Sequence, residues 1–377
     1  STPPASEGAF AGGFASIRAF NDTVQEVFAL SPTELRAQAT RRGAKNSRGG
    51  MSELASPTAG TLSLRLPFRK PFCPDNLFGH LAATAVPGVE EWRAGAYRRT
   101  IRLSHGHALV SLKPADDHVV CQISLTDQRD LASAISRCRW MLDLDADPVA
   151  VDAVLSQDPL MATLVANHPG RRVPKTVDPD EFAVRAVLGQ QVSTAAARTH
   201  ASRLVSAYGD RITDPHGGLT HLFPTPNILA PMNPSDLAMP QSRRRTVMGL
   251  VEALAEGQLD LGVGADWREA RVRLNALHGF GPWTVESIAM RSLGDPDAFL
   301  SGDLGVKLAA GQLGIPATPQ APTYHSSPCP PRLALRRVRA CLSAWPASST
   351  KRATATSPCS WAWEWWARAT PTSPSPN

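Results

Sequence analysis

One aspartate behind a glycine hairpin carries the chemistry that this sequence can be expected to do. Asp303 lies 22 residues after Gly281, beyond one predicted helix and one loop. A carboxylate can stabilise a cation that develops on a sugar, and it can orient or deprotonate a water molecule. A single carboxylate such as Asp303 can therefore support hydrolysis of a glycosidic bond. A plain helix N-cap is the other interpretation, because helical residues follow Asp303, and the two roles are compatible.

The hairpin Gly279-Phe280-Gly281 offers a site for a phosphate group. Two glycines around one apolar residue permit positive φ and a close approach of the backbone to a ligand. Phe280 can fill the space between two helices, while the glycine N–H groups and the N-terminus of the helix near Trp283 or Thr284 face outward. A Gly-x-Gly run alone indicates only a turn, so the phosphate interpretation depends on Asp303 behind it.

Helices must position these residues. Asp266 as an N-cap and the apolar spacing after it predict a helix before the hairpin, and residues 285–293 predict one after it. Upstream, the apolar pattern is interrupted at Gly189-Gln190-Gln191, which predicts a break between two helices with both glutamines exposed. The basic run 241–246 opens another predicted helix, where the arginines either face phosphates or lie on a solvated helix start.

Residues 61–130 show the period of two that is typical of strands. Strands are predicted at 62–68, 96–103, 108–112 and 119–125, with a helix over about 74–85. We expect an antiparallel sheet with one solvated face. The predicted fold class is an α+β N-terminal subdomain, an antiparallel sheet with helices, followed by an all-α body over residues 131–314.

Composition narrows the classes of partner. The formal net charge of +6 favours a polyanion, nucleic acid first. No run of about 18 apolar residues is present, and the N-terminus lacks the pattern of a signal peptide, so we expect a cytoplasmic protein without a membrane span. The six cysteines form no Cys-x-x-Cys pair, so no metal site or redox dithiol is predicted, and Cys121 reads as a core residue.

Together these motifs resemble the helix-hairpin-helix DNA glycosylases, and within them the 3-methyladenine DNA glycosylase II (AlkA-like) family. The similarity rests on the hairpin with Asp303, on residues 187–193 (Val-Leu-Gly-Gln-Gln-Val-Ser) and on residues 223–226 (Phe-Pro-Thr-Pro), and it covers roughly residues 61–315. It implies a glycosylase that removes alkylated purines from double-stranded DNA in base excision repair.

The resemblance also implies roles for individual positions. Asp303 matches the catalytic carboxylate. The phosphate-binding hairpin would comprise Gly279, Phe280, Gly281 and Thr284. The base pocket would include Trp283, His80, Ser287 and Leu304, of which the last three replace aromatic residues of the family. The wedge that fills the gap left by a flipped base would be Gln191, with Gln190 beside it.

Trp283 separates two kinds of glycosylase. Members of the superfamily that also cut the strand carry a lysine at this position, and an indole cannot form their Schiff base. We therefore predict a monofunctional enzyme. Trp283 either stacks on the cationic alkylated base or packs in the core. We expect a monomer without a cofactor, although the hairpin is compatible with a monovalent cation.

The first 60 residues read as two segments. Residues 1–43 resemble the last helices of an AraC-type helix-turn-helix domain, as in an Ada–AlkA-type fusion, and the matching DNA-contact positions are Ser16, Arg18 and Asn21. Because only the end of that domain is recognisable, we expect a remnant without operator binding. A short amphipathic helix of another kind is the alternative. Residues 44–60 read as a linker.

Residues 315–377 have a low-complexity composition with 11 prolines and one acidic residue. A shifted reading frame of a GC-rich gene would give such a composition, and a genuine disordered tail is the other interpretation. With a frameshift near residues 315–325, the helices that complete the family's pocket would be missing. The alternative for the whole chain is a non-catalytic or inactive DNA-binding or regulatory protein that uses the hairpin only as a phosphate clamp.

Overall fold

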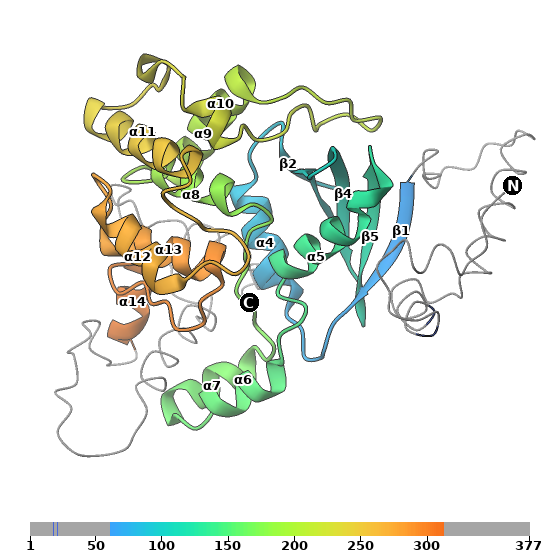
Figure 1. Ribbon diagram of the computed structural model, residues 1–377. Coiled ribbons are helices and arrows are strands. Elements are labelled where there is room, and N and C mark those ends of the chain that lie inside the picture. Colours follow the sequence, from blue (N-terminus) through green and yellow to red (C-terminus); the bar gives the residue numbers. More distant parts are fainter. Residues whose placement is uncertain (1–17, 19–20, 22–60, 313–377) are drawn as a thin grey trace, which may run out of the picture.

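The computed structural model describes residues 18, 21 and 61–312 (Figure 1). The expectations for Ser16, for the linker and for residues 315–377 lie outside the described residues. Arg18 and Asn21 are both helical and exposed. Within the described part of the chain, no helix is both long and apolar enough to cross a membrane.

The N-terminal unit is built around one five-stranded sheet. The strands are β1 (Thr61–Pro67), β2 (Glu90–Arg93), β3 (Ala96–Arg102), β4 (His107–Pro114) and β5 (His118–Leu125). Their order in the sheet is β1-β5-β4-β3-β2, and every pairing is antiparallel. The predicted antiparallel sheet is confirmed. Strand β1 forms one edge of the sheet and pairs with β5, the last strand of the unit.

Strand β2 is an element that the sequence pattern does not predict. Its four residues, Glu-Glu-Trp-Arg, contain one apolar side chain and show no alternation. The strand forms because Ala94 and Gly95 both adopt positive φ, 51° and 76°, which gives the tight turn that suits a two-residue hairpin.

The prediction of a solvated sheet face is wrong for β3. All residues from Ala96 to Ile101 are buried, Arg98 and Arg99 included. The reason is electrostatic: these two guanidinium groups find carboxylates on neighbouring elements, so this strand can be covered on both faces.

Two helices pack on the sheet and complete its core. They are α4 (Pro74–Thr84) and α5 (Leu131–Met141), and in Figure 1 both lie between the sheet and the rest of the helices. Cys121 is fully buried, as predicted, in the same apolar cluster as Cys138 of α5. The apolar core of the sheet therefore includes α5, which begins just after the predicted boundary at residue 130.

The helical body surrounds α8 (Pro179–Leu188), whose residues from Glu181 to Leu188 are buried except for Arg185. Figure 1 shows α8 among α9, α11 and α13. The remaining α-helices are α6 (Pro148–Leu155), α7 (Pro159–Asn167), α9 (Thr194–Tyr208), α10 (Pro226–Leu229), α11 (Gln241–Ala255), α12 (Trp267–Ala276), α13 (Pro282–Ile288) and α14 (Leu304–Gln312). A π-helical turn, Ala289–Leu293, continues α13.

A group of four charges, buried except for the half-buried Arg185, joins the two parts. Arg99 of β3 contacts Glu90 of β2 at 3.1 Å and Glu181 of α8 at 2.7 Å. Arg185, one turn further along α8, contacts Glu90 at 3.0 Å and Glu181 at 2.7 Å. Burial alone would raise the pKa of Glu90, but Arg185 and Arg99 lower it to about 2, so the carboxylate stays ionised. The sheet thereby fixes α8, which leads into the candidate site.

Candidate active site

Asp303 lies where α14 begins and is nearly buried, with 5% of its surface exposed. Its Oδ1 accepts a hydrogen bond from the backbone N–H of Val306 at 3.2 Å, as an N-cap does. Its Oδ2 accepts one from the indole Nε1 of Trp283 at 3.1 Å. Burial raises the pKa of Asp303, while the Trp283 indole, the backbone amides and Lys307 oppose that rise. The carboxylate is therefore desolvated, but three N–H donors and the charge of Lys307 favour its ionised form.

The hairpin between α12 and α13 uses its two glycines differently. Gly279 has φ of 78°, and a Cβ there would lie 2.2 Å from Oγ1 of the buried Thr246 on α11. Gly281 has φ of −103°, and a Cβ there would meet no atom within 4 Å. Of the two hairpin glycines, which both permit positive φ, only Gly279 adopts it, whereas Gly281 is the N-cap of α13. Only Gly279 is required by the packing of the hairpin.

The other two hairpin residues are anchored in the helical body. Phe280 is half-buried and packs against its core, as predicted. Thr284 is buried, and its N–H donates to the carbonyl of Gly281 at 3.0 Å. The hairpin backbone is therefore held from beneath by side chains that point into the protein.

The predicted break after α8 is present, since α8 ends at Leu188 and α9 begins at Thr194 with Ser193 as its N-cap. Gln191 is exposed and has φ of 55°. The expected exposure of Gln190 is wrong: it is half-buried, because its side-chain amide donates to the carbonyl of Gly279 at 3.2 Å and to the hydroxyl of Thr284 at 3.0 Å. The break thus contacts the hairpin directly.

The loop that leads to Asp303 is held by residues that the sequence reasoning missed. Arg271 of α12 contacts Glu286 of α13 at 2.9 Å and Asp295 at 2.6 Å. The other oxygen of Glu286 accepts the backbone N–H of Phe299 at 3.3 Å. A charged residue within the otherwise apolar pattern after the hairpin was the available signal. These contacts set the path of the chain from the hairpin helix to the aspartate.

The four expected pocket residues are not equally close to the carboxylate. Trp283 contacts Asp303, Leu304 is its chain neighbour, and Ser287 is buried one turn after Trp283. His80 on α4 lies with its Nε2 2.8 Å from a guanidinium nitrogen of Arg291. Burial, then Arg291, lower the pKa of His80, so its imidazole is neutral. The imidazole of His80 therefore contacts the π-helical turn, to which Arg291 belongs.

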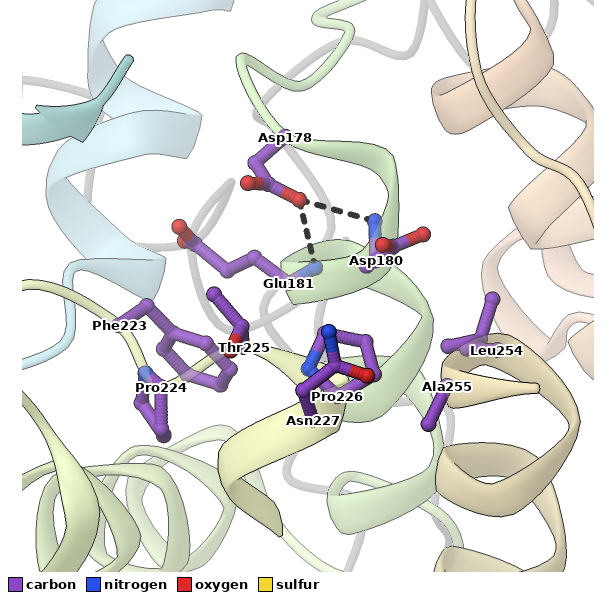
Figure 2. Close-up of a pocket in the computed structure, with 10 residues that line it drawn as sticks. All are labelled: Asp178, Asp180, Glu181, Phe223, Pro224, Thr225, Pro226, Asn227, Leu254 and Ala255. Carbon is purple, nitrogen blue, oxygen red and sulfur yellow. Dashed lines mark hydrogen bonds between the residues drawn. The ribbon is translucent and has the colours of Figure 1, made fainter. Parts of the chain in front are cut away.

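A cavity of about 270 Å³ lies at the N-terminus of α8, as Figure 2 shows. Its lining includes the segment 223–226 and three acidic residues, but no residue of the predicted catalytic, wedge or hairpin sets. Asp178 uses its carboxylate to cap α8, accepting the N–H groups of Asp180 and Glu181 at 3.0 Å each. Burial, with Asp178 and Asp260, raises the pKa of Asp180 to about 6. Two of the three acidic residues of this wall have structural roles, because Asp178 caps α8 and Glu181 belongs to the charge group.

No group of three or more His, Cys, Asp or Glu side chains among the described residues could hold a metal ion.

The arginines at the start of α11 are partly engaged within the protein. Arg243 donates to the carbonyl of Gln190 at 2.6 Å and Arg244 to that of Met239 at 2.8 Å, whereas Arg245 is exposed. Of the two interpretations of this basic run, internal contacts account for two of its three arginines.

The chain was compared with known proteins. Residues 63–178 match the model of the AlkA N-terminal domain. A Mycobacterium tuberculosis protein described as a probable bifunctional transcriptional activator/DNA repair enzyme AlkA is 56% identical over 324 residues. That alignment covers 86% of this chain and 64% of the relative, so the chain spans less than two thirds of that protein's length. DNA-3-methyladenine glycosylase 2 of Escherichia coli is 31% identical over 236 residues, covering 61% of this chain and 81% of the relative.

Solved structures support the same fold. The 3-methyladenine DNA glycosylase of Archaeoglobus fulgidus superposes with a TM-score of 0.57 at 20% identity, over 66% of this chain and 86% of that one. The apo form of the 8-oxoguanine glycosylase/lyase of Clostridium acetobutylicum gives 0.55 at 18% identity, over 69% and 86%. An α+β unit followed by a helical body is therefore the architecture of the described part of this chain.

Proposed function

The chain belongs to the DNA-3-methyladenine glycosylase 2 (AlkA) family, and on this premise we propose that it is a monofunctional DNA glycosylase. It hydrolyses the N-glycosidic bond of alkylated purines of the 3-methyladenine type in double-stranded DNA, as a step of base excision repair. The observation that carries the proposal is the buried carboxylate of Asp303, held by Trp283 of the helix that follows the hairpin.

The chemistry needs little beyond this carboxylate. The glycosidic bond breaks through an oxocarbenium-like sugar, which a nearby negative charge stabilises. The same carboxylate orients or deprotonates the attacking water. An alkylated purine is already cationic and leaves without a strong general acid. The indole and backbone N–H groups on Asp303 favour its ionised form against the effect of burial, and that is the form the reaction uses.

Trp283 supports the assignment as a hydrolase. Its indole nitrogen carries no free electron pair for attack on C1′, so no Schiff base with the sugar can form at this position. Incubation with methylated DNA and borohydride should trap no covalent adduct. A borohydride-stable adduct would show that the chain is also a lyase.

The proposed contacts to DNA follow from position. The outward backbone of Gly279 and Gly281 binds a phosphate, helped by the N-terminus of α13. Gln191 fills the gap that a flipped base leaves, and Trp283, His80, Ser287 and Leu304 belong to the wall around that base. A monomer that works in the cytoplasm without a cofactor completes the proposal. Residues 1–43 alone bind no operator, which a gel shift with that segment tests.

Release of free base tests the function directly. The purified full chain is incubated with DNA methylated by an alkylating agent, and the bases released are separated and identified by chromatography. We expect 3-methyladenine from the wild type and none from Asp303→Asn. A chain that binds this DNA and releases no base would instead be the non-catalytic DNA-binding protein, with the hairpin as a phosphate clamp only.

A further inference from the structure

We propose that Gln190 is a positioning residue that fixes Gln191 relative to the hairpin, so that the wedge and the phosphate clamp act as one rigid unit. The inference rests on the proposed function, because a wedge has a role only where a base leaves the duplex.

The side-chain amide nitrogen of the half-buried Gln190 is engaged within the protein. Its Nε2 carries two hydrogens, and the structure provides an acceptor for each: the carbonyl of Gly279 at 3.2 Å and the hydroxyl of Thr284 at 3.0 Å. These acceptors lie at the two ends of the hairpin. A glutamine that makes both contacts cannot also enter the DNA stack, so it serves to join the α8–α9 break to the hairpin.

The backbone of Gln190 is held as well. Arg243, at the start of α11, donates from its guanidinium to the carbonyl of Gln190 at 2.6 Å. The charged donor makes this the stronger kind of hydrogen bond. Three segments far apart in sequence, the break after α8, the start of α11 and the hairpin, therefore meet at one residue.

The neighbouring residue shows why such a hold is needed. Gln191 has φ of 55°, a left-handed conformation that is unfavourable for a residue with a Cβ. Such a conformation persists where the surroundings determine it. Gln190 on one side and the N-cap Ser193 on the other bracket this residue, and its side chain is exposed to solvent. These two flanking residues hold Gln191 in a conformation in which it is exposed to solvent.

The test compares duplex with single-stranded methylated DNA. Only the duplex requires a wedge, because a single strand has no partner base to displace. Single-turnover release of 3-methyladenine is measured for wild type, Gln190→Ala, Gln191→Ala and the double variant. Gln258→Ala is the matched control, since the side chain of that exposed glutamine donates to Glu256, a residue outside the hairpin and the α8–α9 break. Thermal melting is recorded for each.

If Gln190 acts through Gln191, Gln190→Ala slows release from duplex by about ten-fold, the effect of losing a pair of hydrogen bonds. Release from single strands stays within about two-fold of wild type, and the double variant is no slower on duplex than Gln191→Ala, as expected for coupled residues. The nearly isosteric Gln190→Glu, which cannot donate to the Gly279 carbonyl, shows a loss in the same direction and guards against a folding defect in the alanine variant.

Two outcomes overturn the inference while leaving the proposed function in place. Losses that add in the double variant would mean that Gln190 contacts DNA by itself. An equal loss on duplex and single strands would mean that Gln190 merely supports the catalytic carboxylate. Absence of base release by the wild type on both substrates would instead overturn the proposed function, and the inference with it.

Discussion

The indole Nε1 of Trp283 lies 3.1 Å from Oδ2 of Asp303, across 20 residues of sequence. Trp283, which follows the hairpin directly, is therefore a hydrogen-bond donor to the proposed catalytic carboxylate. A lysine at position 283 would change both the available nucleophile and the electrostatic environment of Asp303.

Asp303→Asn should abolish base release while DNA binding is kept. The amide oxygen can keep the bond from the Val306 N–H or the bond from the indole, but not both, because these donors bind different oxygens of the carboxylate. The amide can neither stabilise the sugar cation as a charge nor deprotonate water. We expect the single-turnover rate to fall at least about 100-fold. Binding to an uncleaved duplex should be unchanged or tighter, because a negative charge near the phosphates is removed. A variant that keeps wild-type rates would contradict the assigned role.

The same substitution should raise stability at neutral pH. Burial raises the pKa of Asp303 above its ordinary value of 3.8. Its contribution to folding is therefore fully present below that ordinary pKa and is lost as the pH rises through the folded value. Asp303→Asn avoids this loss. Its melting temperature should exceed that of wild type by a few degrees at pH 7 and match it below about pH 4. A lower melting temperature at pH 7 would contradict the argument.

Trp283→Phe should move the pH profile of base release. The indole N–H lowers the pKa of Asp303, so its removal lets burial raise that pKa further. The acidic limb of the profile, where activity appears as the carboxylate ionises, should shift to higher pH. Trp92→Phe, on an exposed indole of β2, is the control and should leave the limb in place.

The two hairpin glycines should fail in different ways. Gly279→Ala combines positive φ with a collision against buried Thr246, so we expect it to lose about 1–3 kcal/mol of stability. Gly281→Ala places its methyl group in open space and should cost less than about 1 kcal/mol, the effect of a poorer N-cap. Its defect should instead be weaker binding of duplex DNA. Equal melting temperatures for the two variants would refute this division.

Glu286→Leu should slow catalysis without weakening DNA binding. The substitution removes the contacts to Arg271 and to the N–H of Phe299, four residues before Asp303. A displaced carboxylate loses its alignment with the sugar, so we expect about a ten-fold lower single-turnover rate. Glu286→Gln keeps an acceptor for Phe299 and should lose less. The comparison of these two rates, with binding measured in parallel, checks the argument.

The elements around the site could be predicted because their signals are local. Asp266, Ser193 and Asp178 each precede an apolar helical pattern and each caps a helix in the structure. The break after Leu188 and the hairpin likewise follow from residues within a few positions of one another. Short-range backbone preferences are enough to set such boundaries.

What could not be predicted depends on partners far away in sequence. Gln190 reads as an exposed polar residue until Thr284, 94 positions later, is placed beside it. Arg99 reads as the solvated side of a strand, because its partner Glu181 is 82 positions away. A polar residue in a pattern shows neither its burial nor its partner, and both are set by tertiary packing.

The buried charge group between the sheet and α8 bears on how such proteins can recombine. Glu90 and Arg99 belong to the sheet, whereas Glu181 and Arg185 belong to the helical body. A chimera cut between the two parts would take half of the group from each parent. Where one parent carries neutral residues at these positions, the other half keeps its own ion pair, Glu90 with Arg99 or Glu181 with Arg185, and loses both contacts across the boundary. We therefore expect such a chimera to be less stable than either parent, although each part has its own core.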